Sequence, residues 1–365
     1  MTDDTASSSP FARVPGAVVD ERGLAHVAAP TREQRDLIAG RALAPLDDRV
    51  VLAVDGVDRL TWLDSITSQA LAALAPGVST ELLVLDPQGH VEHAASVVDD
   101  GERTWLIVDR SHADALLTWL TRMRFRLRVE LHDLSDRMRV IGGTGDAVAA
   151  LPALAVWRDP WPEVGVGGWG YAPATPHPGT AYDWSEAVVT VDTAADIAAA
   201  AASGSQAVAG WMAVDAVRVA AWRPRADTEA DGRALPHEAD WLRSAVHLDK
   251  GCYRGQETVA KVHNLGHPPR RLVSLQLDGS DARLPERGAE VFFGEDAVGA
   301  VTSVARHHEE GPIALAYVKR TTPTDAELTV AVDGGVVAAA QEVIVPPDAG
   351  RTAAVPRMPR LSRRR

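Results

Sequence analysis

Cysteine and lysine are nearly absent from this chain. Cys252 is the only cysteine among 365 residues, and Lys250, Lys261 and Lys319 are the only lysines, against a large excess of arginine. A single cysteine excludes an internal disulfide framework. It also excludes a zinc or iron–sulfur site built from several cysteines of this chain alone. Any thiol chemistry must therefore use Cys252.

Long apolar runs and targeting signals are also missing. The amino terminus is acidic and polar, without the basic and apolar regions of a secretory signal peptide. The alanine-rich run near residues 194–203 contains Asp196 and few large apolar side chains, which is not typical of a membrane span. We therefore expect a cytoplasmic protein with no membrane partner, and a monomer is the default expectation.

Three common motifs of nucleotide-binding proteins and hydrolases do not occur. The chain has no GxxxxGK[ST] loop, no GxSxG elbow and no GxGxxG after a strand. Residues 142–145, Gly-Gly-Thr-Gly, follow a predicted strand, and their amides could hold an anion. The rest of a dinucleotide fingerprint is absent, which favours an ordinary tight turn.

The charge balance is acidic. A formal net charge of −13 repels phosphate and argues against general nucleic-acid binding. The exception is the segment 351–365, which holds six arginines and no acid. Its prolines and its lack of apolar periodicity predict a disordered basic tail over 346–365. The tail is either solvated without a specific partner or contacts nucleic acid or an acidic protein.

Strand and helix patterns mix along most of the chain. Strand-like runs at 50–54, 80–85, 91–98 and 104–108 are separated by turn signals, and a helical pattern begins at Ser111. This order predicts an α+β fold rather than a doubly wound one. After residue 271, six short strands at regular spacing predict a small antiparallel β-barrel. The expected divisions are a disordered tail at 1–17, a core at 18–270 with subdomains at about 45–150 and 151–270, the barrel at 271–345 and the basic tail at 346–365.

One short segment surrounds the sole cysteine, with the sequence Lys250-Gly251-Cys252-Tyr253-Arg254-Gly255-Gln256-Glu257. Two glycines allow a tight turn, and two cations near the thiol could lower its pKa. Cys252 could then act as a nucleophile, a sulfur carrier or one ligand of a shared metal site. The alternative is a small buried apolar side chain without chemistry.

Other polar residues could belong to the same site. Glu238 and Glu257 could bind a polar ligand, or they could fix the loop through backbone hydrogen bonds. Arg218 stands one helical turn after Asp215, which predicts an ion pair within one helix.

The cysteine segment resembles the signature of the YgfZ family, K-G-C-[FY]-x-G-Q-E, at every fixed position. The likeness extends to residues 233–238, where the family carries a Pro-x-Glu element, and to residues 299–303, which resemble its G-x-[LV]-T-S strand. It covers roughly residues 45–345.

The resemblance implies a fold and a function. YgfZ proteins are similar in fold to the glycine cleavage T-protein, the aminomethyltransferase GcvT. That implies a folate-binding core of two α+β subdomains and a small barrel around a central opening, with tetrahydrofolate or a derivative as the ligand. The family is implicated in assembly or repair of iron–sulfur clusters in client enzymes, as an accessory protein rather than a classical enzyme. Carried onto this chain, Cys252 is the essential thiol. The residues implied to frame it or to bind ligand are Lys250, Gly251, Tyr253, Arg254, Gly255, Gln256, Glu257, Glu238 and Arg218.

Two departures separate this chain from the transferases. The transferases carry paired acids after a Gly-Gly turn, where this chain reads Gly89-His90-Val91-Glu92-His93. The family pattern R-[IL]-E-A-G-x-P corresponds to residues 218–224 of this chain. Ala220 stands where that pattern has the glutamate that helps to hold the pterin in the transferase relatives, and Trp222 stands where it has glycine. The first departure argues against amine transfer, and the second argues against folate binding. Two alternatives stay open, a folate-dependent aminomethyltransferase and a tRNA-modification factor.

Overall fold

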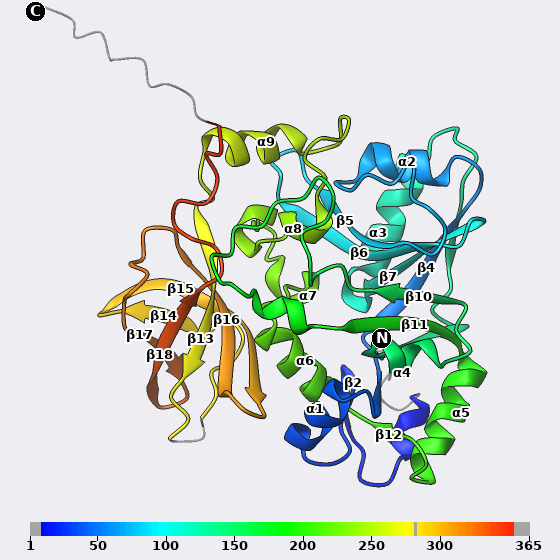
Figure 1. The fold of residues 1–365 in the computed structure, drawn as a ribbon, viewed down its shortest axis with the longest axis horizontal. Helices are drawn as coiled ribbons and strands as arrows, with labels where there is room; N and C mark the ends of the chain where they lie inside the picture. The colour runs from blue at the N-terminus through cyan, green and yellow to red at the C-terminus, as the bar shows by residue number, and fades with distance from the viewer. Residues whose placement is uncertain (1–8, 281–282, 354–365) are drawn as a thin grey trace, which may run out of the picture.

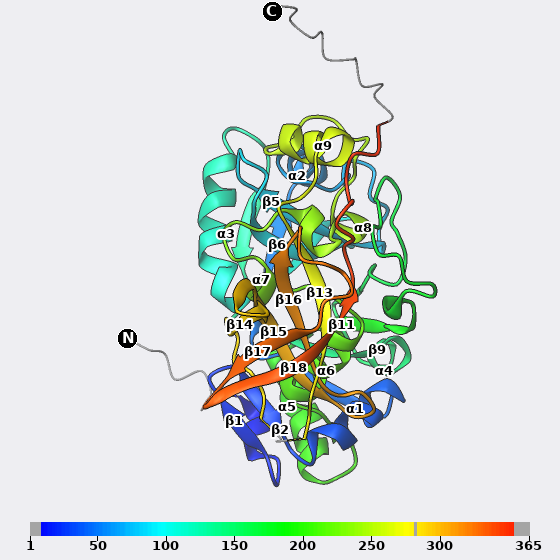
Figure 2. The same cartoon turned by 90° about the vertical axis from the view of Figure 1, so that its left-hand side faces the viewer.

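Two five-stranded sheets and a closed barrel lie side by side in this protein (Figure 1). The computed structural model describes residues 9–280 and 283–353. The barrel packs against the two sheets through the helices that connect them to it (Figures 1 and 2). The predicted α+β fold with a carboxy-terminal barrel is confirmed.

The first sheet is antiparallel, with strand order β5-β6-β7-β4-β8. Strands β4, β5 and β7 carry continuous apolar runs that are buried on both faces, and tight turns such as Asp99-Asp100-Gly101 join neighbouring strands. Two helices cover one face and bury Trp62, Leu116 and Leu120 against Leu52. The elements are β4 (Arg49–Asp55), α2 (Arg59–Ile66), β5 (Ser79–Leu85), β6 (Val91–Asp99), β7 (Arg103–Asp109), α3 (Arg110–Met123) and β8 (Glu130–Asp133).

The second sheet has the order β10-β11-β9-β3-β12, with one parallel pair, β3 and β12. It takes strands from both sides of residue 150, so the predicted subdomain border there is wrong. The hydrophobic strand β9 pairs along its whole length with β11, which no local pattern reveals. The elements are β3 (Ala42–Pro45), β9 (Met138–Thr144), α4 (Gly145–Ala149), β10 (Ala155–Arg158), η3 (Pro178–Ala181), β11 (Trp184–Thr190), α5 (Val191–Ala202) and β12 (Ala207–Val208).

The amino-terminal segment is ordered from residue 9, contrary to the predicted tail over 1–17. Phe11 and Val14 are buried in the same apolar cluster as Ile197 of α5, and this burial holds the segment in place. Residues 1–8 lie outside the described part. The elements that follow are η2 (Pro10–Arg13), β1 (Val18–Asp20), β2 (Gly23–His26) and α1 (Pro30–Ile38).

The barrel closes in the order β13-β16-β15-β14-β17-β18, with β18 pairing back onto β13. Closure leaves no free sheet edge, and small and β-branched side chains fill the interior. Its strands are β13 (Arg270–Leu277), β14 (Glu290–Phe293), β15 (Asp296–His307), β16 (Gly311–Lys319), β17 (Leu328–Val332) and β18 (Gly335–Val343).

The helices between the second sheet and the barrel hold the three bodies together. One apolar cluster contains Leu85 of the first sheet, Trp222 and Trp241 of the connecting segments, and Tyr317 of the barrel. The connecting elements are α6 (Trp211–Ala220), α7 (Ala226–Glu229), η4 (Pro236–Ala239), α8 (Leu242–Ala245) and α9 (Gln256–Leu265). Within the described residues, no helix is long and apolar enough to cross a membrane.

The predicted basic tail begins later than residue 346. Ala349 is buried, and the backbone amides of Thr352 and Ala353 donate to the carbonyl oxygens of His263 and Asn264 at the end of α9. The prediction of disorder is therefore wrong for residues 346–353. The remainder, 354–365, lies outside the described residues.

Candidate functional site

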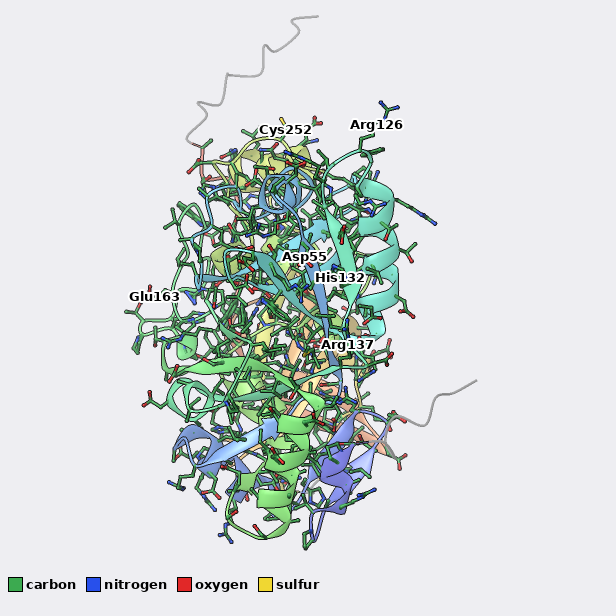
Figure 3. The ribbon with its side chains drawn as sticks, turned by 90° about the vertical axis from the view of Figure 1, so that its right-hand side faces the viewer. Asp55, Arg126, His132, Arg137, Glu163 and Cys252 are labelled. Carbon is green, nitrogen blue, oxygen red and sulfur yellow. The ribbon has the colours of Figure 1, made fainter. Side chains whose placement is uncertain are left out.

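Cys252 is exposed at one end of the molecule, on the loop that joins α8 to α9 (Figure 3). The next side chain along the chain, Tyr253, is buried. Burial of Tyr253 fixes the loop while the thiol faces solvent. The alternative of a small buried apolar side chain is therefore wrong for Cys252.

Lys250 points away from solvent and holds the loop to the first sheet. Its ammonium group donates to the carbonyl oxygens of Thr67, 2.8 Å away, Gln69, 2.7 Å away, and Asp64. These carbonyls lie at and just beyond the end of α2, where a helix leaves acceptors without partners. The ring of Tyr253 lies 5.3 Å from the same ammonium. Burial lowers the pKa of Lys250 to about 8.

The two glycines of the motif have different roles. Gly255 has a φ of +85°, and a Cβ there would lie 2.7 Å from the carbonyl oxygen of Asp86. Gly251 has no positive φ, and a Cβ on it would meet no atom within 4 Å. The expectation that both glycines serve a tight turn is therefore wrong for Gly251. Just after the turn, the side-chain amide of Gln256 donates to the carbonyl oxygen of Lys250 at 3.2 Å and closes the loop.

Arg254 joins the loop to β6. One guanidinium nitrogen of Arg254 lies 2.5 Å from a carboxylate oxygen of Glu92. Glu257, at the start of α9, is exposed. Because Lys250 and Arg254 both bind other groups, the expected pair of cations around the thiol is not what the structure shows. The Cys252 side chain is exposed to solvent on its loop.

Glu238 does not lie with the thiol. Its side chain is fully buried, and its carboxylate accepts from the backbone amides of Leu235 and Arg270 at 3.2 and 3.0 Å. It also pairs with the Arg270 guanidinium at 2.8 Å. Of the two readings of Glu238, loop fixation is the one that its contacts support, because these bonds join η4 to the first barrel strand.

Arg218 is buried at the junction of α6, α7 and the barrel. It pairs with Asp215 at 3.2 Å, as the sequence spacing predicts, and with Glu229 at 3.3 Å. It also donates to the hydroxyl of Ser303 on β15 at 2.9 Å. Because each bond goes to a buried partner, Arg218 joins elements and is not free for a ligand.

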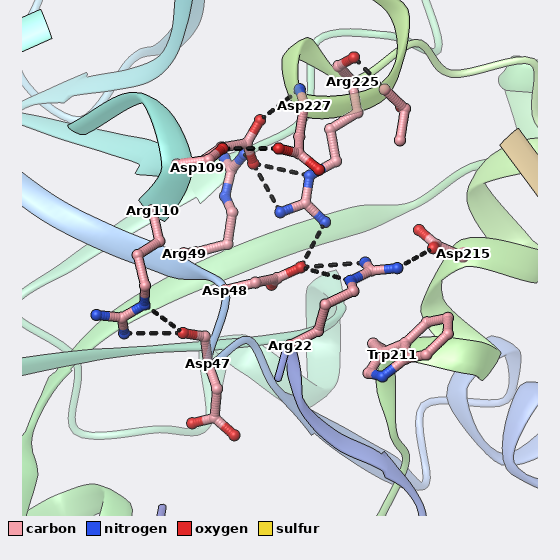
Figure 4. A network of polar contacts seen from close by, with 12 residues as sticks. Arg22, Asp47, Asp48, Arg49, Asp109, Arg110, Trp211, Asp215, Arg225 and Asp227 are labelled. Atoms are coloured by element: carbon pink, nitrogen blue, oxygen red, sulfur yellow. Dashed lines mark hydrogen bonds and ion pairs between the residues drawn. The ribbon is translucent and has the colours of Figure 1, made fainter. Parts of the chain in front are cut away.

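A partly buried network of arginines and aspartates joins β4, β7 and α6, and we call this region the centre (Figure 4). Arg22 bridges Asp48 and Asp215 at 3.0 and 2.7 Å, and Arg225 bridges Asp48 and Asp109 at 2.9 and 2.6 Å. Burial raises the pKa of Asp109, but the charges of Arg225 and Arg49 overcome this and hold it well below the ordinary value. The Asp109 carboxylate therefore stays charged and paired.

A second ionic group lies beside this network. Arg223 pairs with Glu81 and Asp159, each at 2.9 Å, and Ser244 donates to the other oxygen of Glu81. Burial raises the pKa of Asp159 to about 6, although the Arg223 charge opposes the shift. Sequence reasoning missed both groups, since the partners are far apart in the chain.

The cavity at this centre is small, about 60 Å³, and is lined by the ion pairs and by Trp157, Trp184 and Trp241. Sites for small organic ligands span about 300–1,000 Å³. Trp222 keeps a left-handed backbone, with φ of +59°, where the family pattern has glycine, and its indole is buried beside His177. A pterin does not fit among these residues.

A larger cavity of about 700 Å³ opens between β6, α3 and residues 230–232. Its walls include His90, His93 and His112, together with Trp119, and we call it the histidine cavity. Burial lowers the pKa of His93 to about 4, so its imidazole is neutral at pH 7. Glu92, the partner of Arg254, also lines the cavity and so connects it to the thiol loop. The described residues contain no cluster of three or more ligands suited to a metal ion.

The fold places this chain among proteins with the glycine cleavage T-protein fold. Residues 270–347 match the family model for the glycine cleavage T-protein C-terminal barrel domain. The crystal structure of the glycine cleavage system aminomethyltransferase T from Bartonella henselae superposes with a TM-score of 0.66 at 19% identity, covering 87% of this chain and 89% of that one.

Particular relatives fall into two functional groups. The chain is 28% identical over 299 residues to an aminomethyltransferase of Rippkaea orientalis, covering 76% of this chain and 79% of that protein. It is 25% identical over 253 residues to the mitochondrial iron–sulfur cluster assembly factor IBA57 homolog of Mycosarcoma maydis, covering 64% of this chain and 57% of that protein. The aminomethyltransferase-like fold is established, and a weak likeness to an assembly factor accompanies it.

Proposed function

We propose that this chain is a YgfZ-type accessory protein that supports assembly or repair of iron–sulfur clusters in client enzymes, with Cys252 as its acting thiol. The observation that carries the proposal is the presentation of Cys252, which is exposed on a loop held by Lys250 and Gly255. The likeness to the assembly factor of Mycosarcoma maydis supports it.

A single exposed thiol suits work on another protein's cluster. Iron–sulfur clusters are held by several thiolates, and this chain has one. Cys252 therefore acts together with ligands from the client, as a shared ligand or a sulfur carrier. This role needs access for a macromolecule, which a loop at the end of the molecule provides (Figure 3).

Folate is a separate part of the proposal. The central cavity does not fit a pterin, so no step is assigned to folate there. The histidine cavity, at about 700 Å³, has the volume of a small-ligand site, and we assign tetrahydrofolate to it. Calorimetry with tetrahydrofolate tests this. Binding that is lost in His93→Ala would support the histidine cavity, and binding that only Trp222→Gly weakens would assign the ligand to the centre instead.

The test of the thiol is complementation. In a strain that lacks the protein, activities of several iron–sulfur enzymes are measured with wild type, Cys252→Ser and the control Thr321→Ser, which changes an exposed barrel turn. We expect the control to restore activity and Cys252→Ser to fail at equal protein level. Full rescue by Cys252→Ser would refute the proposal.

A second candidate, an aminomethyltransferase, is favoured by the identity to the enzyme of Rippkaea orientalis. Against it, the position of the paired acids holds His90, bonded to Asp86 at 2.9 Å, and Glu92, bonded to Arg254. Neither of these two side chains offers a free carboxylate to act on an amine. Formation of methylenetetrahydrofolate from an aminomethyl donor by purified protein would support this candidate over the first.

A further inference from the structure

Four arginines alternate with apolar residues where α3 ends and the chain turns toward β8. The segment reads Arg122-Met123-Arg124-Phe125-Arg126-Leu127-Arg128, and we call it the arginine loop. Its backbone is anchored at both ends. The indole of Trp62 donates to the carbonyl oxygen of Met123 at 3.0 Å, and Arg128 forms an ion pair with Asp58 at 2.8 Å. The loop is therefore pre-ordered.

Phe125 occupies a position just after a helix where glycine is the usual residue. It directly follows Arg124, the last residue of the helix cap, and has a φ of +48°. A left-handed residue just after a helix is usually glycine, because other residues pay a steric cost there. The Phe125 ring is nevertheless 78% exposed, and Leu127 beside it is 42% exposed. Packing within the chain does not explain an aromatic residue at this site.

The remaining arginines of the loop are free. In the part of the chain that the structure describes, Arg122, Arg124 and Arg126 take part in no ion pair. A cation in the last helical turn is stabilised by the helix dipole, which accounts for Arg122. It does not account for Arg124 and Arg126 on either side of an exposed aromatic ring. The cluster has a local positive charge on a protein whose net charge is −13.

The arginine loop lies at the same end of the molecule as Cys252 (Figure 3). The histidine cavity connects the two, because Arg122 lines it together with Glu92, which is bound to Arg254 of the thiol loop. A partner seated on the arginine loop would therefore lie near the exposed thiol.

We propose that the arginine loop is a docking surface for a partner protein that presents an acidic segment around an apolar pocket. Phe125 fills the pocket, and Arg122, Arg124 and Arg126 pair with its carboxylates. Identifying this partner as the iron–sulfur client rests on the proposed function. The docking chemistry itself is independent of that function.

Residue types favour a protein over the other anionic partners. Arginine, methionine and aromatic residues are the types enriched in protein–protein interfaces and their hot spots, and arginine recognises carboxylates in a bidentate way. A single-stranded nucleic acid needs a positive groove that follows its backbone with several stacking rings, and the loop offers one ring. A membrane surface would engage with more apolar area than Phe125 and Leu127 provide.

The experiment places a photo-crosslinking amino acid, benzoylphenylalanine, at Phe125 of the full chain in living cells. The matched control carries it at Phe293, which is 42% exposed on the barrel. We expect the Phe125 position alone to crosslink to a protein, and mass spectrometry to place the crosslink in a segment rich in aspartate and glutamate. Reversal of Arg124 and Arg126 to glutamate should reduce the yield about tenfold or more.

The same partner, once purified, gives a binding measurement. Phe125→Gly suits the left-handed backbone, so it should bind at least about tenfold more weakly while its melting temperature is equal or higher. Crosslinks to RNA, to lipid or to a second copy of this chain, or a yield insensitive to charge reversal, would overturn the proposal. Cys252→Ser should leave the crosslink unchanged. Failure of the thiol hypothesis is then seen in enzyme rescue alone, and failure of the docking hypothesis in the crosslink alone.

Discussion

The ammonium nitrogen of Lys250 lies 2.8 Å from the carbonyl oxygen of Thr67, and this bond ties the thiol loop to the end of α2. Two further carbonyls, of Asp64 and Gln69, share the same ammonium. The lysine two residues before the cysteine thus serves as a hydrogen-bond donor to backbone carbonyls. It positions Cys252 without touching it.

Lys250→Met should destabilise the fold by about 3 kcal/mol, because it leaves three carbonyls without a charged donor. Chemical denaturation measures this. Lys261→Met on α9, which removes another of the few lysines, is the control and should stay within about 0.5 kcal/mol. If Lys250→Met has the stability of the control, the capping role is wrong.

Gly255 and Gly251 form a matched pair within one loop. Gly255→Ala places a Cβ 2.7 Å from the Asp86 carbonyl oxygen on a left-handed backbone, and should cost about 2 kcal/mol or more. It should also change the rate at which a disulfide reagent reacts with Cys252. Gly251→Ala meets no neighbour and should leave both quantities near the wild-type values. Equal effects of the two substitutions would contradict this division of roles.

Removal of Arg223 should be among the most damaging single changes in the centre. Arg223→Met leaves Glu81 and Asp159 as buried carboxylates without their cation, and we expect a loss of about 3–5 kcal/mol. Arg41→Met breaks an exposed ion pair with Asp36 and should cost less than about 1 kcal/mol. Denaturant midpoints of the two variants, measured at one pH, test this prediction, and equal midpoints would contradict it.

Asp240 predicts a pH dependence of stability. It is fully buried, its Oδ2 accepts no hydrogen bond and lies 3.8 Å from the Arg243 guanidinium, and burial raises its pKa to about 7. Because the folded pKa exceeds the unfolded value, the native state holds the proton more tightly. The stability from this group is present below about pH 4 and is lost as pH rises toward 7.

Asp240→Asn keeps a residue type that tolerates the left-handed backbone at this position, where φ is +55°. Relative to wild type, it should gain stability as pH rises from about 4 to 7, by roughly 2–4 kcal/mol in total. Thermal unfolding across this pH range measures the difference. Parallel pH profiles of the two proteins would show that Asp240 does not titrate there.

The fold and its carboxy-terminal barrel could be predicted from the sequence, because short strands at regular spacing carry a local signal. The barrel strand Glu290–Phe293 is one of the six short strands found from residue 270 onward. The border between the sheets could not be predicted, since β9 joins β11 and β3 through long-range pairing. The ordered structure of residues 9–17 could not be predicted either, because it depends on a pocket for Phe11 formed by distant residues.

For the candidate site, the residues alone show that one cysteine carries any thiol chemistry and that its neighbours form a recognisable motif. Where those neighbours point becomes known only once the chain is folded. Lys250 and Arg254 turn to a helix end and to Glu92, while Glu238 and Arg218 serve buried junctions elsewhere. Sequence spacing records which residues are near along the chain. The partners that satisfy a buried charge come from wherever folding brings carboxylates and carbonyls together, and that is a property of the packed structure alone.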